Sequence, residues 1–422
     1  MINKLKPKSE FSRNVLTLMT GTTIAQAIPI AISPILTRIY TPEDFGVFAL
    51  YMSVASILSV VATGRYELAI MLPKKDEDAV NIVVLSIMIA FFVSFVSLLI
   101  VFFFNAQITN LFGNPEISNW LYFIPITVLL TGVYQSFNYW SNRKKQYKKL
   151  SHNRIIRSAT TTTVNLGMGF SGLGSSGLIL GGVIGQFFAT LTLGQSLWYK
   201  NKTMVTVVKK LKVIALAKKY SKFPKFDILA TLSNVMSHQV VHILFNILVN
   251  TSTSGYYYLV QKIMGMPTVL ISSSVSDVFR EQASSNFIKY GHAKQIFVLV
   301  LRKLFLLSLI PFLFLFLFVQ DLFIFVFGAN WAEAGLYAKI LMPMFFLQFI
   351  ASPLSYILYI TDSQKLNLFM QMGMFFFVLL SFLCGHIFEN THLIIILISG
   401  FTSMIYLLYI IMSYHKSKGD FK

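Results

Sequence analysis

Residues 79–104, AVNIVVLSIMIAFFVSFVSLLIVFFF, contain no ionisable side chain. A helix rises about 1.5 Å per residue, so this stretch exceeds the roughly 30 Å of hydrocarbon in a bilayer. The charged segment PKKDED, residues 73–78, comes directly before it, and residues 105–118, which follow it, contain no Lys or Arg. The stretch therefore predicts a transmembrane helix with one flank that contains cations and one flank that contains none.

Eleven further apolar windows of similar length predict an all-α integral membrane protein with twelve transmembrane helices. Loops rich in Lys and Arg alternate with loops that contain almost none, and basic loops are retained on the cytoplasmic side of a membrane. Both termini are therefore expected in the cytoplasm. The predicted spans are residues 14–36, 45–72, 79–104, 118–140, 154–173, 177–198, 226–249, 255–278, 297–320, 336–359, 366–388 and 392–414.

The composition supports this assignment. Hydrophobic residues make up 55% of the 422 residues and charged residues only 12%, whereas a soluble domain has about 25% charged residues. The net charge of +19 lies in short loops between spans, so we expect membrane lipids as partners and no nucleic acid. The single cysteine, Cys384, excludes an intramolecular disulfide and a cysteine-based metal site. The apolar stretch at the basic N-terminus continues to Leu36, which is too long for a signal peptide and indicates a retained span.

The longest loop divides the chain into halves. Residues 200–225 form a basic cytoplasmic linker between a six-helix lobe at 1–199 and a six-helix lobe at 226–422. A weak repeat supports this division, because DFGVFAL at 44–50 and TSGYYYL at 253–259 each open the second span of a half. Repeated halves are usual in secondary transporters, whose substrate path lies between them. The sequence therefore predicts two lobes around a central cavity.

Four cations lie outside the basic loops: Arg38, Arg65, Lys262 and Lys339. An ionisable group within a span costs about 2.5–3.5 kcal/mol near the centre, so it normally faces a cavity or a partner. Arg65 and Glu67 both lie in the second predicted span. At about 100° per residue their side chains point about 200° apart, so they are not expected to neutralise each other on one face.

Two interpretations of Arg65 remain open at this point. Arg65 contacts an anion in a cavity, while Glu67 pairs elsewhere or takes a coupling ion. Alternatively, Arg65 forms a salt bridge between spans or reaches the inner head groups, since Leu72 is only two turns away.

Lys262 lies about two turns into the eighth predicted span, and Tyr258 shares its helix face at the i, i+4 spacing. A lysine here can offer a point charge to phosphate, with aromatic faces nearby for sugar rings; the alternative is that it reaches the head groups. Arg38 and Lys339 occupy ordinary positions at the outer interface. Arg38 can also line an outer vestibule.

The seventh predicted span carries a polar stripe at helical spacing, which indicates either hydrogen bonds between helices or the wall of a wet cavity. Two of its members are histidines four residues apart, but no third ligand accompanies them, so we expect no metal. A protonation role for the imidazoles or for the carboxylate remains open. The stripe comprises Asp227, Thr231, Asn234, His238, His242 and Asn246.

Gly177, Gly181 and Gly185 form a doubled GxxxG pattern, which predicts close packing of the sixth span against a neighbour. The sequence contains no nucleophile elbow, P-loop or dinucleotide fingerprint. We therefore expect a protein that is not an enzyme, binds no cofactor and does not hydrolyse ATP.

Three short motifs resemble bacterial polysaccharide flippases of the Wzx type, in the multidrug/oligosaccharidyl-lipid/polysaccharide (MOP) exporter superfamily. Residues 34–46, PILTRIYTPEDFG, resemble the first external turn of these proteins. Two further segments strengthen the resemblance. They are residues 65–70, RYELAI, followed by Leu72-Pro73, and Tyr220 with Phe223-Pro224. The layout of spans extends it over the whole chain.

The resemblance implies a flippase that moves undecaprenyl-diphosphate-linked oligosaccharide repeat units to the periplasmic leaflet of the bacterial inner membrane by alternating access. It implies that Arg65 and Lys262 are cations of the cavity. Together with the residues singled out above, the candidate substrate contacts are Arg65, Lys262, Arg38, Tyr258, Asn234, His238 and His242. H⁺ or Na⁺ is the expected coupling ion, with Glu67 and Asp227 as its candidate ligands. A polysaccharide polymerase and a chain-length regulator are the expected protein partners in O-antigen synthesis. The alternatives are a peptidoglycan lipid-precursor flippase and a multidrug cation antiporter of the same superfamily.

Overall fold

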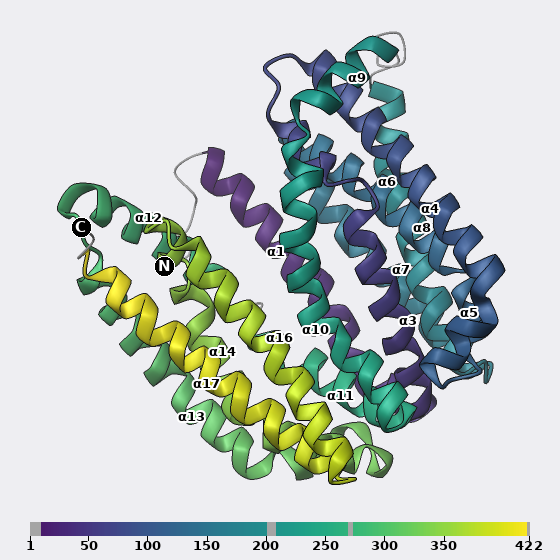
Figure 1. Ribbon diagram of the computed structural model, residues 1–422, viewed down its shortest axis with the longest axis vertical. Coiled ribbons are helices and arrows are strands. Elements are labelled where there is room, and N and C mark those ends of the chain that lie inside the picture. Colours follow the sequence, from purple (N-terminus) through teal and green to yellow (C-terminus); the bar gives the residue numbers. More distant parts are fainter. Residues whose placement is uncertain (1–9, 201–207, 269–272, 420–422) are drawn as a thin grey trace. The chain divides into compact units, whose positions relative to one another are not determined.

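The computed structural model describes residues 10–200, 208–268 and 273–419, and these residues form helices joined by turns, with no strand among them (Figure 1). The all-α fold expected from the sequence is confirmed. Ten of the helical segments are long and apolar enough to cross a membrane. The chain is therefore a multi-pass membrane protein. Twelve spans were expected. The predicted spans 154–173 and 255–278 do not form helices that are both long enough and apolar enough to be counted among the ten.

These two spans fall short for different reasons. Helix α7 (Tyr147–Phe170) is 24 residues long, enough to cross a bilayer, but it contains Arg154, Arg157 and four consecutive threonines. Helix α11 (Thr251–Met264) has only 14 residues. The polar helix α12 (Ser273–Tyr290) follows it, and residues 269–272 of the predicted eighth span lie outside the described part of the chain.

The chain forms two compact units, Met1–Val235 and Met236–Lys422, and the division falls within α10 (Ile228–Leu248). The lobes and linker expected at 1–199, 200–225 and 226–422 stay a prediction. Residues 201–207 of that linker lie outside the described residues, as do the first nine residues of the chain with their basic flank.

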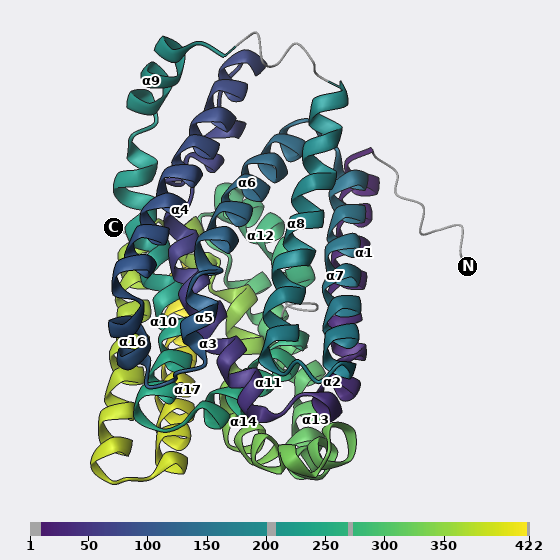
Figure 2. The same ribbon diagram turned by 90° about the vertical axis from the view of Figure 1, so that its right-hand side faces the viewer.

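In the first unit, α7 packs against α1 and α8, and α6 packs against α3, α4 and α8. Figure 2 shows α1, α6, α7 and α8 side by side. The elements before α10 are α1 (Glu10–Ala31), α2 (Ser33–Ile39), α3 (Pro42–Val61), the 3₁₀ helix η2 (Tyr66–Met71), α4 (Asp76–Phe112), α5 (Ile117–Leu121), α6 (Ile124–Arg143), α7, α8 (Ser175–Lys200), α9 (Lys210–Lys219) and the π-helical turn η4 (Phe223–Asp227).

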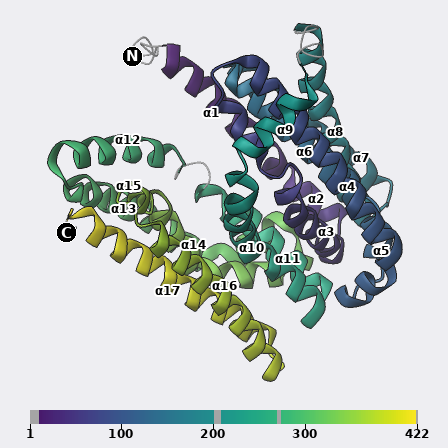
Figure 3. The ribbon, with the colours of Figure 1, turned by 45° about the horizontal axis from the view of Figure 1, so that its top comes forward.

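In the second unit, α14 is the most buried helix and packs against α11, α12, α13 and α17. Helix α12 packs along α13, α14 and α15 (Figure 3). After α10, the elements are α11, α12, α13 (Lys294–Phe327), the 3₁₀ helix η6 (Ala329–Trp331), α14 (Ala332–Leu354), α15 (Ile357–Ile360), α16 (Gln364–Ile387) and α17 (Thr391–Ser417).

Helix α3 is shorter than the predicted span 45–72. A capping box begins it: the Thr41 amide donates to the Asp44 carboxylate at 2.8 Å, and the Asp44 amide donates to the Thr41 hydroxyl at 3.2 Å. The helix ends at Val61, and Gly64 and Arg65 then adopt φ angles of 59° and 61°. Two consecutive left-handed residues cannot continue a right-handed helix. The prediction of one continuous helix through residue 72 is therefore wrong.

The glycine pattern on α8 marks a close helix contact, as predicted. A Cβ atom added at Gly181 would lie 1.8 Å from Oδ1 of Asn165, and one added at Gly185 would lie 1.9 Å from Oγ1 of Thr161. Both partners belong to α7, so the absence of side chains lets α7 and α8 approach closely.

We expect Gly185→Leu to lower the free energy of unfolding by about 1–3 kcal/mol, because the new side chain must push α7 away from α8. Thermal unfolding of the protein in detergent measures the change. Gly182→Leu is the matched control, since an added Cβ there meets no atom within 4 Å. Equal unfolding temperatures for the two variants would contradict the packing role.

Candidate functional site

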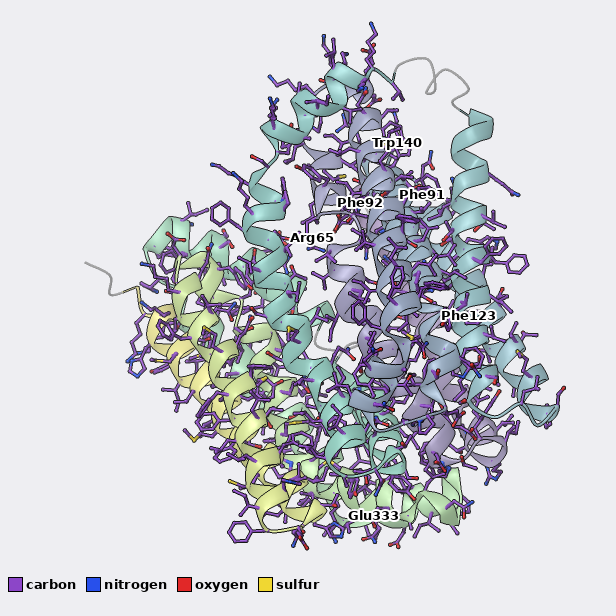
Figure 4. All side chains as sticks on the ribbon, turned by 45° about the vertical axis from the view of Figure 1, so that its right-hand side comes forward. Arg65, Phe91, Phe92, Phe123, Trp140 and Glu333 are labelled. Atoms are coloured by element: carbon purple, nitrogen blue, oxygen red, sulfur yellow. The ribbon has the colours of Figure 1, made fainter. Side chains whose placement is uncertain are left out.

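Three charged side chains form a cluster in the first unit. The Nε atom of Arg65 donates to Oδ2 of Asp227 at 2.6 Å, and a terminal nitrogen of Arg65 donates to Oε1 of Glu67 at 3.1 Å. The left-handed turn at Gly64 and Arg65 positions the arginine, and the turn η4, just before α10, supplies the aspartate. Figure 4 shows Arg65 beside the first turns of α10. The cluster therefore joins the turn after α3 to the turn before α10.

Hydroxyl groups complete this cluster. Thr63 donates a short hydrogen bond to Oε2 of Glu67, and Thr231 donates to Oδ2 of Asp227 at 3.5 Å. Glu67 is fully buried, whereas the Asp227 side chain is 37% exposed. Two carboxylates share one guanidinium, so the ionised cluster has a formal charge of −1.

The expectation that Arg65 and Glu67 do not neutralise each other is wrong. It assumed α-helical geometry, in which their side chains diverge, but residue 65 is left-handed and residues 66–71 form a 3₁₀ helix. The two side chains consequently meet. Of the alternatives open for Arg65, the structure has the geometry of a salt bridge between segments. Whether Arg65 also contacts an anion stays a prediction.

The segment around the cluster is anchored at several points. The Tyr66 hydroxyl donates to the carbonyl oxygen of Ala217 on α9 at 2.9 Å. Arg143 at the end of α6 donates to the carbonyl oxygen of Ile70 at 3.1 Å. Tyr66 and Ile70 also belong to an apolar core with Trp140, which is 1% exposed. These contacts hold η2 in place and so hold Arg65 in position.

Helix α9 is attached to the acidic first turn of α4. The Nζ atom of Lys212 lies 3.2 Å from Oε2 of Glu77 and 3.5 Å from Oδ1 of Asp78. The hydrogen bond to Glu77 raises the pKa of the Lys212 ammonium, so the group stays charged at neutral pH. Leu211, the residue before Lys212, is exposed.

The predicted polar stripe on α10 has two distinct parts. Asn234 and His238 are exposed, whereas His242 and Asn246 are buried. The ring of His242 lies 5.4 Å from that of Tyr257 and 6.0 Å from that of Tyr258. Among the described residues, no group of three His, Cys, Asp or Glu side chains has the arrangement of a metal site.

Lys262 differs from Arg65 in its surroundings. It lies in the last turn of α11, half-buried, and no described carboxylate lies within 4.0 Å of its ammonium. A cation in the last turn of a helix also favours the helix dipole, which gives Lys262 a structural role beside any binding role. Tyr258 lies one turn earlier on the same helix.

The remaining two isolated cations have ordinary surroundings. Arg38 is exposed and donates to the carbonyl oxygen of Pro34 at 3.0 Å. The ammonium of Lys339 lies 5.9 Å from the centre of the Phe316 ring. Both positions suit contacts at the membrane interface.

Two arginines were missed by the sequence reasoning because they were counted with the basic loop before the fifth span. Arg154 and Arg157 lie within α7, beyond its second turn. Arg154 donates a short hydrogen bond to the Thr22 hydroxyl on α1, and Arg157 lies over the ring of Tyr134 on α6. The low hydropathy of residues 147–170 was the available signal.

Comparison with known proteins assigns the chain to a family. Residues 35–335 match the model of a family described as polysaccharide biosynthesis protein. The chain belongs to this family. No curated protein matches it.

Solved structures share the fold over nearly the whole chain. The Lipid II flippase MurJ in an inward closed conformation matches with a TM-score of 0.69 at 12% identity, covering 95% of this chain and 87% of that one. A MOP superfamily transporter from Pyrococcus furiosus matches with a TM-score of 0.63 at 10% identity, covering 95% and 94%. An outward-facing multidrug transporter of the MATE family matches with a TM-score of 0.61 at 11% identity, covering 95% and 94%. The resemblance to MOP exporters seen in the sequence is thus confirmed for the fold.

We expect Arg65→Gln to destabilise this family member by about 3–5 kcal/mol, because Glu67 is then buried without its cation. Adding Glu67→Gln should restore much of the loss, since a neutral amide needs no guanidinium. Thermal unfolding in detergent measures both variants. Lys212→Gln, which breaks an exposed pair, should leave the unfolding temperature nearly unchanged. An Arg65→Gln variant as stable as the wild type would show that the ion pair contributes nothing.

Proposed function

We propose that this protein flips undecaprenyl-diphosphate-linked oligosaccharide repeat units across the bacterial inner membrane by alternating access, for O-antigen or related surface polysaccharide synthesis. The match to the polysaccharide biosynthesis family over residues 35–335 carries the proposal. The shared fold with MOP transporters supports it, since the solved structures with this fold include a flippase and a transporter. A polysaccharide polymerase and a chain-length regulator are the proposed functional partners.

The substrate class sets chemical requirements that the described residues meet. A diphosphate needs cations, and Lys262 has no described carboxylate partner to neutralise it. Sugar hydroxyls need polar side chains, and Asn234 and His238 are exposed along α10. Sugar rings stack on aromatic faces, which Tyr258 can supply one turn from Lys262.

The charge cluster is the proposed site of ion coupling. Glu67 and Asp227 together have one negative charge more than Arg65 neutralises, so the cluster can take up H⁺ or Na⁺. Binding such an ion would weaken the attraction between Arg65 and one carboxylate. Because these contacts join η2 to η4, ion uptake would loosen the link between the second and seventh membrane segments.

Two other functions share this fold and remain as rivals. The similarity to a Lipid II flippase favours a peptidoglycan lipid-precursor flippase. The similarity to a multidrug transporter favours a drug antiporter, but that function suits buried acids better than Lys262, a cation with no carboxylate partner among the described side chains.

Complementation separates these functions. We expect the gene to restore surface polysaccharide in a strain that lacks its O-unit flippase and not to restore growth after loss of the peptidoglycan precursor flippase. Drug resistance conferred on a sensitive strain is the third measurement. Rescue of growth or drug resistance without rescue of surface polysaccharide would overturn the proposal.

In the complemented strain, Lys262→Gln should reduce surface polysaccharide about tenfold or more, because a charge-assisted hydrogen bond to phosphate contributes about 1.5–3 kcal/mol. Lys262→Arg should retain part of the activity. Lys339→Gln removes the same charge from the same unit at an interface position and should have little effect. Polysaccharide immunoblots, normalised to the amount of inserted protein, provide the measurement. Equal losses in Lys262→Gln and Lys339→Gln would argue against a binding role.

Cysteine labelling tests whether the exposed part of α10 faces water. In a Cys384→Ala background, Asn234→Cys and His238→Cys should react with a membrane-impermeant maleimide. His242→Cys, whose position is buried, should react slowly, and Val240→Cys on the opposite face should not react. Protection of all four positions would favour a purely packing role for the stripe.

A further inference from the structure

Helix α9 packs against the first turns of α4, where the sequence of α4 changes from charged to apolar (Figure 2). The Lys212 ammonium contacts Glu77 in the acidic first turn of α4. One turn later on α9, Leu216 belongs to the same apolar core as Ala79 and Val83, at the start of the uncharged run of α4. Because α4 is long and apolar enough to cross a membrane, a helix attached on both sides of this change lies where head groups meet hydrocarbon.

The side of α9 that faces away from this core is partly apolar. Val213 and Leu216 are buried, whereas Leu211 is 83% exposed and Ile214 is 45% exposed. At about 100° per residue, Leu211 and Lys218 lie about 20° apart around the helix, and about 140–160° from the two buried residues. Exposed aliphatic side chains beside lysines are typical of helices that lie in a membrane interface.

The exposed charge of this segment is positive throughout. Residues 209–225 contain seven lysines and no Asp or Glu. Of these lysines, only Lys212 forms an ion pair among the described side chains. Lysines next to a membrane attract anionic lipid head groups of the cytoplasmic leaflet, and the basic loops of this chain are expected on that side. The six other lysines are exposed: Lys209, Lys210, Lys218, Lys219, Lys222 and Lys225.

We propose that the exposed side of α9 binds anionic phospholipids of the cytoplasmic leaflet. Leu211 and Ile214 would enter the boundary of the hydrocarbon, while Lys218 and Lys222 contact the phosphates of the head groups. A lipid surface suits both features of α9, since it offers hydrocarbon to the apolar residues and phosphate to the lysines. This interaction is separate from binding of the transport substrate, so failure of the proposed function would leave it unaffected.

Lipid binding at α9 would also support the turn that carries Arg65. The Tyr66 hydroxyl donates to the carbonyl oxygen of Ala217 on α9 at 2.9 Å, and Tyr66 directly follows Arg65 in the chain. A membrane-bound α9 would therefore give η2 a fixed attachment at the bilayer surface.

The test places one fluorophore on α9 of the full-length protein in phosphatidylcholine nanodiscs. In a Cys384→Ala background, Leu211→Cys is labelled with bimane, and a small fraction of either phosphatidylglycerol or phosphatidylcholine carries a spin label near the head group. Both spin-labelled lipids should quench the bimane. Phosphatidylglycerol should quench about threefold more strongly or better, because the lysines enrich anionic lipid around the label. About 0.5 M NaCl should reduce this difference without any further variant, since salt screens exposed charges.

Two pairs of substitutions assign the effect to α9. Lys218→Gln with Lys222→Gln should abolish the difference between the two lipids. Lys289→Gln with Lys294→Gln, which removes two exposed lysines from the second unit, should leave it unchanged. Equal quenching by both lipids at low salt, with the lysines intact, would overturn the preference for anionic lipid. A bimane that neither lipid quenches would place this side of α9 in water and overturn the proposal in favour of a protein partner.

Discussion

The fully buried carboxylate of Glu67 constrains much of the first unit. An ionised carboxylate without partners is too costly to bury, so the chain must bring a cation and hydroxyl groups to it. Arg65 and Thr63 are these partners. Arg65 contacts Glu67 from a left-handed backbone conformation just after the end of α3. The same guanidinium also holds Asp227, 162 residues later in the chain. The buried carboxylate and its cation thus link the turn after α3 to the turn before α10.

Most of the fold could be predicted from hydrophobic length alone. Span 79–104 lies within α4, because its apolar residues need a helix that satisfies every backbone hydrogen bond internally in lipid. The turn at Gly64 and Arg65 could not be predicted in the same way. Apolar residues lie on both sides of the Thr63–Glu67 segment, so the window 45–72 is long and apolar enough to be predicted as one helix. Because this turn was not predicted, the side chains of Arg65 and Glu67 were wrongly expected to point away from each other.

The candidate site was harder to predict than the fold, because charge in a sequence does not reveal pairing. Arg65 and Lys262 looked equivalent as isolated cations, yet the first contacts two carboxylates and the second contacts none of those described. Arg157 went unnoticed since it followed a basic loop, although its helix begins ten residues earlier. Hydropathy averages merge such a residue with its neighbours, so the sequence alone did not show that Arg157 lies within a helix that also contains the basic residues before it.

The glycine contact between α7 and α8 has a mechanical consequence. The side chains of Thr161 and Asn165 on α7 pack directly against the backbone of Gly185 and Gly181 on α8, which has no side chains of its own there to change rotamer, so close packing favours movement of the two helices as one element. Any conformational cycle of this protein would then bend the chain elsewhere, at turns such as the one around Gly64. Arg157, which lies on α7, would then move together with α8.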